Sequence, residues 1–178
     1  MNPVSSPAVI GIDPSSTSTA IAHHDGAVRL VRLSSLPKGS PAGMRMARIQ
    51  RIVTEVQVAV DTAGSVTLAV IEGYAYGTIH GAASQAELGG ILRWHLWGQG
   101  IPVLELTPGT LKKFATGDGS AGKTAMVIAA RDRLGYDGVS DDKADALWLR
   151  AAGLTVLGET PDGVTNGAAK NLLKVAVP

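Results

Sequence analysis

Two apolar runs in the first half of the chain each end in a carboxylate. Residues 8–13 read AVIGID and residues 66–72 read VTLAVIE, so the runs end at Asp13 and Glu72. Continuous apolar runs of this length are typical of buried strands, which end where the chain reaches a polar edge. The pattern therefore predicts two buried strands that each deliver an acidic side chain to the edge of a sheet.

Between these runs the sequence predicts a hairpin. Residues 15–24 and 27–33 are strand-like segments on either side of Asp25-Gly26. That dipeptide is strongly favoured in tight turns, because both positions tolerate positive φ. Together with residues 8–13, these segments predict an antiparallel three-stranded opening.

Helical periodicity follows the hairpin. Apolar side chains recur at steps of three to four residues from Met44 to Val60, which predicts an amphipathic crossover helix. Thr107-Pro108 is typical of a helix start, with an N-cap residue followed by proline. Further helices are expected over residues 84–97, 111–114, 124–134 and about 141–152, with another strand at 101–106. This order predicts an α/β fold with a mixed sheet and helices on both faces.

Length and composition favour a single domain over residues 1–178. Residues 154–178 have weak periodicity and are left unassigned. The chain has no cysteine, which excludes disulfides and thiolate metal sites, so any metal must be held by carboxylates or histidines. No apolar stretch is long enough to span a bilayer, and the N-terminus lacks the features of a secretory signal. We therefore expect a cytoplasmic location and no membrane partner.

Two more acids complete the candidate chemistry. Asp142 and Asp145 are three positions apart, so on a helix they project from one face. Taken singly, each acid has an ordinary explanation as a turn residue, a strand end or a helix N-terminal acid, and the last applies best to Asp141. Carboxylates that packed together would repel one another unless a hard divalent cation such as Mg²⁺ lay between them.

Three segments carry a specific resemblance. GIDPSSTSTA, IEGYAYG and DDKADALWLR are similar to the catalytic strands and the final catalytic helix of RuvC-type Holliday junction resolvases, which have a ribonuclease H-like fold. The resemblance covers residues 9–153. The family commonly has glycine after Asp-Pro, where this chain has Ser15. Such a difference is expected of a divergent member of the family, for example one from a phage. The resemblance implies four catalytic and metal-binding acids, namely Asp13, Glu72, Asp142 and Asp145.

The same resemblance implies a function. A pair of Mg²⁺ ions, or Mn²⁺ as a substitute, would assist hydrolysis of a phosphodiester bond, and the substrate would be branched DNA, foremost a four-way junction. Paired symmetric nicks require two active sites, so we expect a homodimer. The helix at residues 84–97 is the candidate interface, because it carries more apolar surface than one buried face requires.

Basic and aromatic residues are the candidate DNA contacts. Lys112 and Lys123 are 11 positions apart, as in the corresponding segment of RuvC-like proteins, and Lys113 is adjacent. Lysines contact phosphates as mobile charges, and aromatic rings stack on unpaired bases. The DNA-binding candidates are therefore Lys112, Lys113, Lys123, Tyr74 and Tyr76. Alternatively, the lysines are ordinary surface residues and the tyrosines pack across the edge of the sheet.

Other functions compete with junction resolution. A nuclease of the same fold that acts on flaps or forks would share the acids. An actin-like protein also begins with a strand and an acid, but it needs two such domains. Residues 117–124 match the spacing of a phosphate-binding P-loop, yet a predicted helix rather than a strand precedes them. A catalytically inert DNA-binding module is the last alternative, and the presence of all four acids argues against it.

Overall fold

A five-stranded mixed sheet forms the centre of the protein. The computed structural model describes residues 6–73 and 82–176. The strand order is β3-β2-β1-β4-β5, in which β1 to β3 form an antiparallel meander and β4 and β5 run parallel to β1. This confirms the predicted antiparallel three-stranded start and the mixed sheet. The strands are β1 (Val9–Asp13), β2 (Ser18–Ala22), β3 (Val28–Arg32), β4 (Leu68–Glu72) and β5 (Val103–Leu106).

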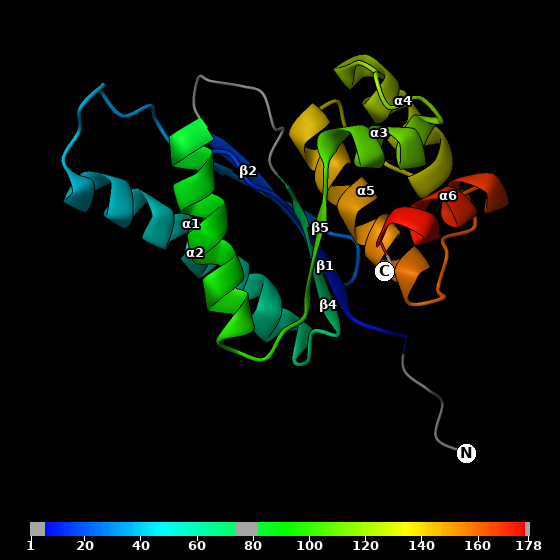
Figure 1. The fold of residues 1–178 in the computed structure, drawn as a ribbon, viewed down its shortest axis with the longest axis horizontal. Coiled ribbons are helices and arrows are strands. Elements are labelled where there is room, and N and C mark those ends of the chain that lie inside the picture. Colours follow the sequence, from blue (N-terminus) through cyan, green and yellow to red (C-terminus); the bar gives the residue numbers. More distant parts are fainter. Residues whose placement is uncertain (1–5, 74–81, 177–178) are drawn as a thin grey trace.

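Helices cover both faces of this sheet, as the sequence predicts. Helices α1 and α2 lie on one face, and α3 to α6 lie on the other (Figure 1). Their bounds are α1 (Ala42–Ala63), α2 (Ala82–Trp97), α3 (Pro108–Thr116), α4 (Lys123–Leu134), α5 (Asp141–Val156) and α6 (Asn166–Ala176).

The alternation of side chains along β1 divides the core in two. Ile10 and Ile12 pack with α1 and α2, whereas Val9 packs with the helices of the other face. Asp13 is two positions from Gly11 and four from Val9, so it shares their face, which is the face that α5 covers. The strand thereby directs its terminal carboxylate toward α5 rather than toward α1.

Helix α5 lies unusually close to β1, because Gly11 leaves room for its backbone. A Cβ atom at Gly11 would lie 2.6 Å from the backbone nitrogen of Arg150 and closer still to the carbonyl oxygen of Ala146. At Gly153, a Cβ would lie 2.6 Å from side-chain atoms of both Val9 and Val70. Both glycines therefore set the distance between α5 and the sheet.

Several element boundaries differ from the sequence expectation. Helix α5 continues to Val156 instead of ending at 152, because its buried side extends through Leu154 and Thr155. The tail that the sequence left unassigned contains α6, whose Leu172 joins the core beside α3 and α5. Helix α3 is longer than the expected 111–114: it begins at Pro108, where the Thr107-Pro108 pair indicated a helix start, and Thr107 accepts a hydrogen bond from the backbone of Thr110.

The glycine-rich segment is not a P-loop. Helix α3 ends at Gly117, which adopts a left-handed conformation, and the segment then leads into α4. A P-loop joins a buried strand directly to its helix, so the residues have the spacing of the motif but not its structural context.

None of the helices in the described part of the chain is both long and apolar enough to cross a membrane.

Candidate metal centre

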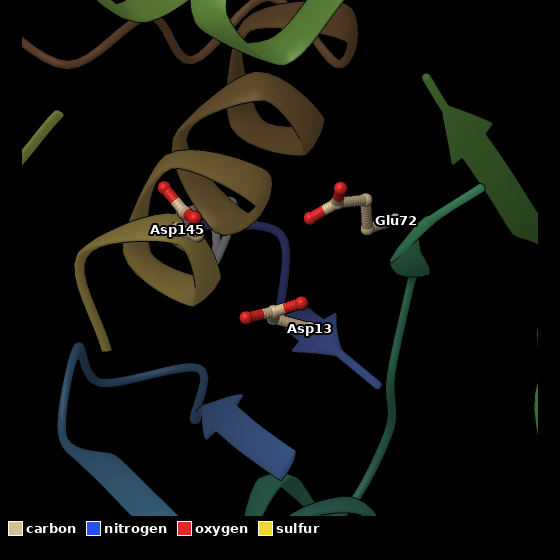
Figure 2. Close-up of side chains that lie close together, drawn as sticks. All are labelled: Asp13, Glu72 and Asp145. Atoms are coloured by element: carbon tan, nitrogen blue, oxygen red, sulfur yellow. The ribbon is translucent and has the colours of Figure 1, made fainter. Parts of the chain in front are cut away.

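Three carboxylates converge at the edge of the sheet. The parallel pairing of β1 with β4 aligns Ile12 with Ile71, so the acids that follow them lie side by side. Helix α5 contributes Asp145. One carboxylate oxygen from each of Asp13, Glu72 and Asp145 lies within 4.8 Å of the others, and Figure 2 shows the three side chains directed toward a shared space.

The electrostatics of this cluster are unfavourable without a cation. Burial raises the pKa of Asp13 well above its usual range, and the charges of the neighbouring carboxylates raise it further. Burial also raises the pKa of Glu72, although a hydrogen bond with Asp13 opposes that shift. For Asp145, burial and then the charge of Glu72 raise the pKa to about 7. The metal-free cluster is therefore partly protonated near neutral pH.

One buried oxygen of the cluster lacks a partner. Asp145 Oδ1 is buried and has no hydrogen-bond partner within the described residues. A buried carboxylate oxygen without a partner is energetically costly, and a cation relieves that cost together with the mutual repulsion of the acids. The oxygen-only donor set suits a hard divalent cation, so these residues fit a metal ion.

The fourth predicted acid lies close to this group but outside it. Asp142 Oδ2 accepts a hydrogen bond of 2.5 Å from Ser18 Oγ, at the start of β2. Its charge still raises the pKa of both Asp13 and Asp145, which places it within electrostatic reach of them. The sequence therefore identified the neighbourhood of Asp142 but not its bond to Ser18. Residues 15–20 read SSTSTA, and nothing in that sequence indicates which of its five hydroxyl groups would bond to Asp142.

Two of the predicted lysines flank the cluster. Lys112 on α3 lies near enough to Glu72 for its positive charge to oppose the rise in the pKa of that carboxyl. Lys123, the first residue of α4, forms an ion pair with Asp141 and is also influenced by the charges of Asp142 and Asp145. Lys113 is exposed on α3. Tyr74 and Tyr76 lie outside the described residues.

The loop that follows Asp13 is fixed by contacts that the sequence did not reveal. Thr19 Oγ1 donates a 2.7 Å hydrogen bond to the carbonyl of Ser15 and accepts one of 3.1 Å from the Ser15 backbone N–H. The Arg48 guanidinium, from α1, donates to the carbonyl oxygens of Ser16 (2.6 Å) and Leu33 (3.1 Å). Arg48 thus ties α1 to the loop beside the cluster, although its sequence context resembles that of any helical arginine.

Comparison with solved structures finds the same fold. The Thermus thermophilus RuvC structure aligns with a TM-score of 0.61 and 23% sequence identity, covering 86% of this chain and 98% of that one. T. thermophilus RuvC in complex with a Holliday junction substrate aligns with a TM-score of 0.63 and 19% identity, covering 87% and 98%. The yeast mitochondrial Holliday junction resolvase Ydc2 aligns with a TM-score of 0.50 and 13% identity, covering 96% and 82%.

Sequence comparison identifies the family. A comparison with curated proteins gave no match. The family model described as crossover junction endodeoxyribonuclease RuvC matches residues 9–152. That range extends from the first residue of β1 through most of α5, so it contains all four predicted acids. The match agrees with the fold and with the order of strands and helices that carry the acids, and the chain belongs to the RuvC family of crossover junction endodeoxyribonucleases.

Proposed function

We propose that this chain is a Mg²⁺-dependent endonuclease that resolves Holliday junctions by paired symmetric nicks. The observation that carries the proposal is the convergence of Asp13, Glu72 and Asp145, with a buried Asp145 oxygen that lacks a partner. The family supports an endonuclease, and the junction substrate bound to T. thermophilus RuvC supports four-way DNA. Such an enzyme acts where cellular DNA is, so we propose a cytoplasmic location.

The metal-binding role falls to the chain's own carboxylates. We assign Asp13, Glu72 and Asp145 to hold one cation, and Asp142 to contribute to a second, with Mn²⁺ as a substitute for Mg²⁺. When bound, the two cations would lower the pKa of a water molecule and stabilise the departing 3′ oxygen. Near neutral pH the metal-free carboxylates share a proton, which binding of a metal would displace. The hydrogen bond from Ser18 orients Asp142 beside them.

Lysines beside the cluster would position the DNA. We assign phosphate contacts to Lys112, whose charge acts on Glu72, to Lys123, which pairs with Asp141, and to the exposed Lys113. Tyr74 and Tyr76 remain proposed stacking residues, because IEGYAYG carries the family resemblance. Phosphate contacts fix the register of the DNA without reading its sequence.

We also propose a homodimer that associates through α2. Leu88 and Leu92 are buried in the core, as expected for the inner side of this helix. Trp94 and Trp97 are 71% and 75% exposed, so neither side chain packs in the core of the single chain. Two exposed tryptophans on one helix are typical of an interface, since tryptophan contributes strongly to association. A second copy of the chain would supply the second active site that paired nicks require.

Among the alternatives, a flap- or fork-directed nuclease shares the same metal centre and differs only in the DNA it prefers. Nucleotide binding loses support because α3 precedes the glycine-rich segment. An inert DNA-binding module would have no need for a buried cluster of acids with raised pKa values.

The test compares DNA structures directly. We would incubate the protein and Mg²⁺ with four-way junction, fork, flap and linear duplex DNA of the same sequence, and map the cuts on each strand. We expect symmetric nicks in the junction and little cutting of duplex. Equal cutting of all four would refute junction resolution but not nuclease activity, and preference for the flap would support the first alternative. Absence of cutting with Mg²⁺ or Mn²⁺ would refute both.

A further inference from the structure

An ion pair joins the first residues of α4 and α5. Lys123 Nζ lies against Asp141 Oδ2, and Asp141 directly precedes Asp142 in the first turn of α5. We infer that Asp141 is a positioning residue, which holds the Lys123 ammonium beside the carboxylate cluster, ready to contact a DNA phosphate. The inference rests on the proposed function and assigns Asp141 a role beyond that of a helix N-terminal acid.

The surroundings of Lys123 give its side chain little restraint. The side chain is 82% exposed and borders an open cavity of about 490 Å³ between α4 and the start of α5. It is also the first residue of α4, where the helix dipole disfavours a cation. A flexible lysine loses considerable conformational freedom when it becomes fixed on a ligand, so a partner that fixes it beforehand lowers the cost of binding.

Asp141 is well placed to provide that restraint. The start of α5 is anchored, because Ser140 caps the helix and its backbone N–H donates a 3.1 Å hydrogen bond to the hydroxyl of Tyr136. Asp141 is only 30% exposed, against 82% for its partner, so the more restrained side chain holds the freer one. The lysine forms its pair with the residue adjacent to the catalytic acids.

The geometry leaves Lys123 able to bind phosphate. An ammonium group has three N–H donors, so a bond to Asp141 leaves two for DNA. The charges of Asp142 and Asp145 also act on Lys123, which shows that the ammonium lies within the field of the metal-binding acids. A phosphate held at that metal centre would therefore approach the free donors of Lys123 without displacing Asp141.

The experiment measures kcat and KM for junction cleavage in Asp141→Asn, Asp141→Glu, Lys123→Ala and the double variant Asp141→Asn with Lys123→Ala. Asp132→Asn is the matched control, because it removes the same charge from an exposed position on α4. We expect Asp141→Asn to raise KM about two- to fivefold, the range of an exposed ion pair, with kcat and the Mg²⁺ requirement unchanged. Asp141→Glu should restore KM, and the control should match wild type.

The double variant separates positioning from other roles. If Asp141 acts through Lys123, the double variant should be no worse than Lys123→Ala alone. Additive losses, a wild-type KM in Asp141→Asn, or tighter binding of DNA by that variant would overturn the inference while wild-type cleavage still upholds the proposed function. A loss of kcat with a changed Mg²⁺ requirement would also overturn it, since that result assigns Asp141 to the metal centre. Wild-type protein that cuts no junction would overturn the proposed function and this inference together.

Discussion

Substitution of Gly11 by alanine should disable the metal centre by pushing helix α5 away from β1. A Cβ at Gly11 would lie 2.6 Å from the Arg150 backbone nitrogen, whereas ordinary contacts begin at 3.4 Å. Helix α5 must therefore move away from β1 by about 0.8 Å or more, because the opposing atoms are backbone and cannot rotate aside. Asp145 lies one residue from Ala146, which receives the closest contact, so it moves with the helix.

A displacement of this size is large for catalysis and moderate for stability. Metal ligands tolerate errors of about 0.2 Å, and a misplacement of about 1 Å can lower a rate roughly 100-fold. Overpacking of a core typically costs about 1–3 kcal/mol. We therefore expect Gly11→Ala to fold, to melt several degrees lower, to cut junctions about 100-fold more slowly, and to need more Mg²⁺ for half-maximal cleavage.

The assay combines thermal melting with junction cleavage over a range of Mg²⁺ concentrations. Gly43→Ala is the matched control, because Gly43 lies in α1 and a Cβ there meets nothing within 4 Å. The control should keep full activity and gain up to about 1 kcal/mol of stability from helix propensity. Wild-type cleavage by Gly11→Ala would refute the view that close packing of α5 on β1 sets the metal centre.

Three further predictions concern charge and assembly. In the metal-free protein the pKa of Asp145 is raised to about 7 from the usual 3.8, so between these values the folded state retains a proton that the unfolded chain releases. The free energy of unfolding should therefore fall as the pH rises from about 4 to about 7. Thermal melting in EDTA should show this slope in wild type and a flatter slope in Asp145→Asn. Lys112→Ala and Lys123→Ala should each weaken junction binding and reduce its salt dependence by about one unit of slope, and unchanged titrations would return both lysines to the ordinary surface. Serine at both Trp94 and Trp97 should yield monomers in sedimentation, unlike wild type, and an unaltered dimer would contradict the α2 interface.

Much of the fold was predictable because hydrophobic pattern and strand ends carry strong local signals. The apolar runs before Asp13 and Glu72 became adjacent parallel strands, and Asp25-Gly26 became the turn between β2 and β3. The three-residue spacing of Asp142 and Asp145 placed both acids on α5. These features depend on short segments of sequence, so they could be inferred before any tertiary contact was known.

Features that depend on contacts between distant segments could not be inferred in this way. The bond between Ser18 and Asp142 joins residues 124 positions apart, and the Arg48 contacts with the loop after Asp13 join α1 to the sheet. The pairing of Lys123 with Asp141 likewise depends on how α4 meets α5. Helix α6 is a different case, because its 11 residues are strongly amphipathic and Leu172 lies on the buried side. That helix had a local signal in the sequence, and the interpretation of the tail overlooked it.

Junction cleavage by wild-type protein and by Asp145→Asn tests the carboxylate metal centre most directly, with Mg²⁺ titrated and binding of the metal followed separately by calorimetry. Asparagine keeps the shape of the side chain but removes the charge beside Asp13 and Glu72, so the substitution acts on the metal centre and not on the fold. We predict that wild type binds Mg²⁺ and makes paired symmetric nicks, while Asp145→Asn folds, binds junction DNA, loses most of its metal affinity and cuts nothing. Full Mg²⁺-dependent cleavage by Asp145→Asn would contradict the assignment of these carboxylates as the catalytic metal centre.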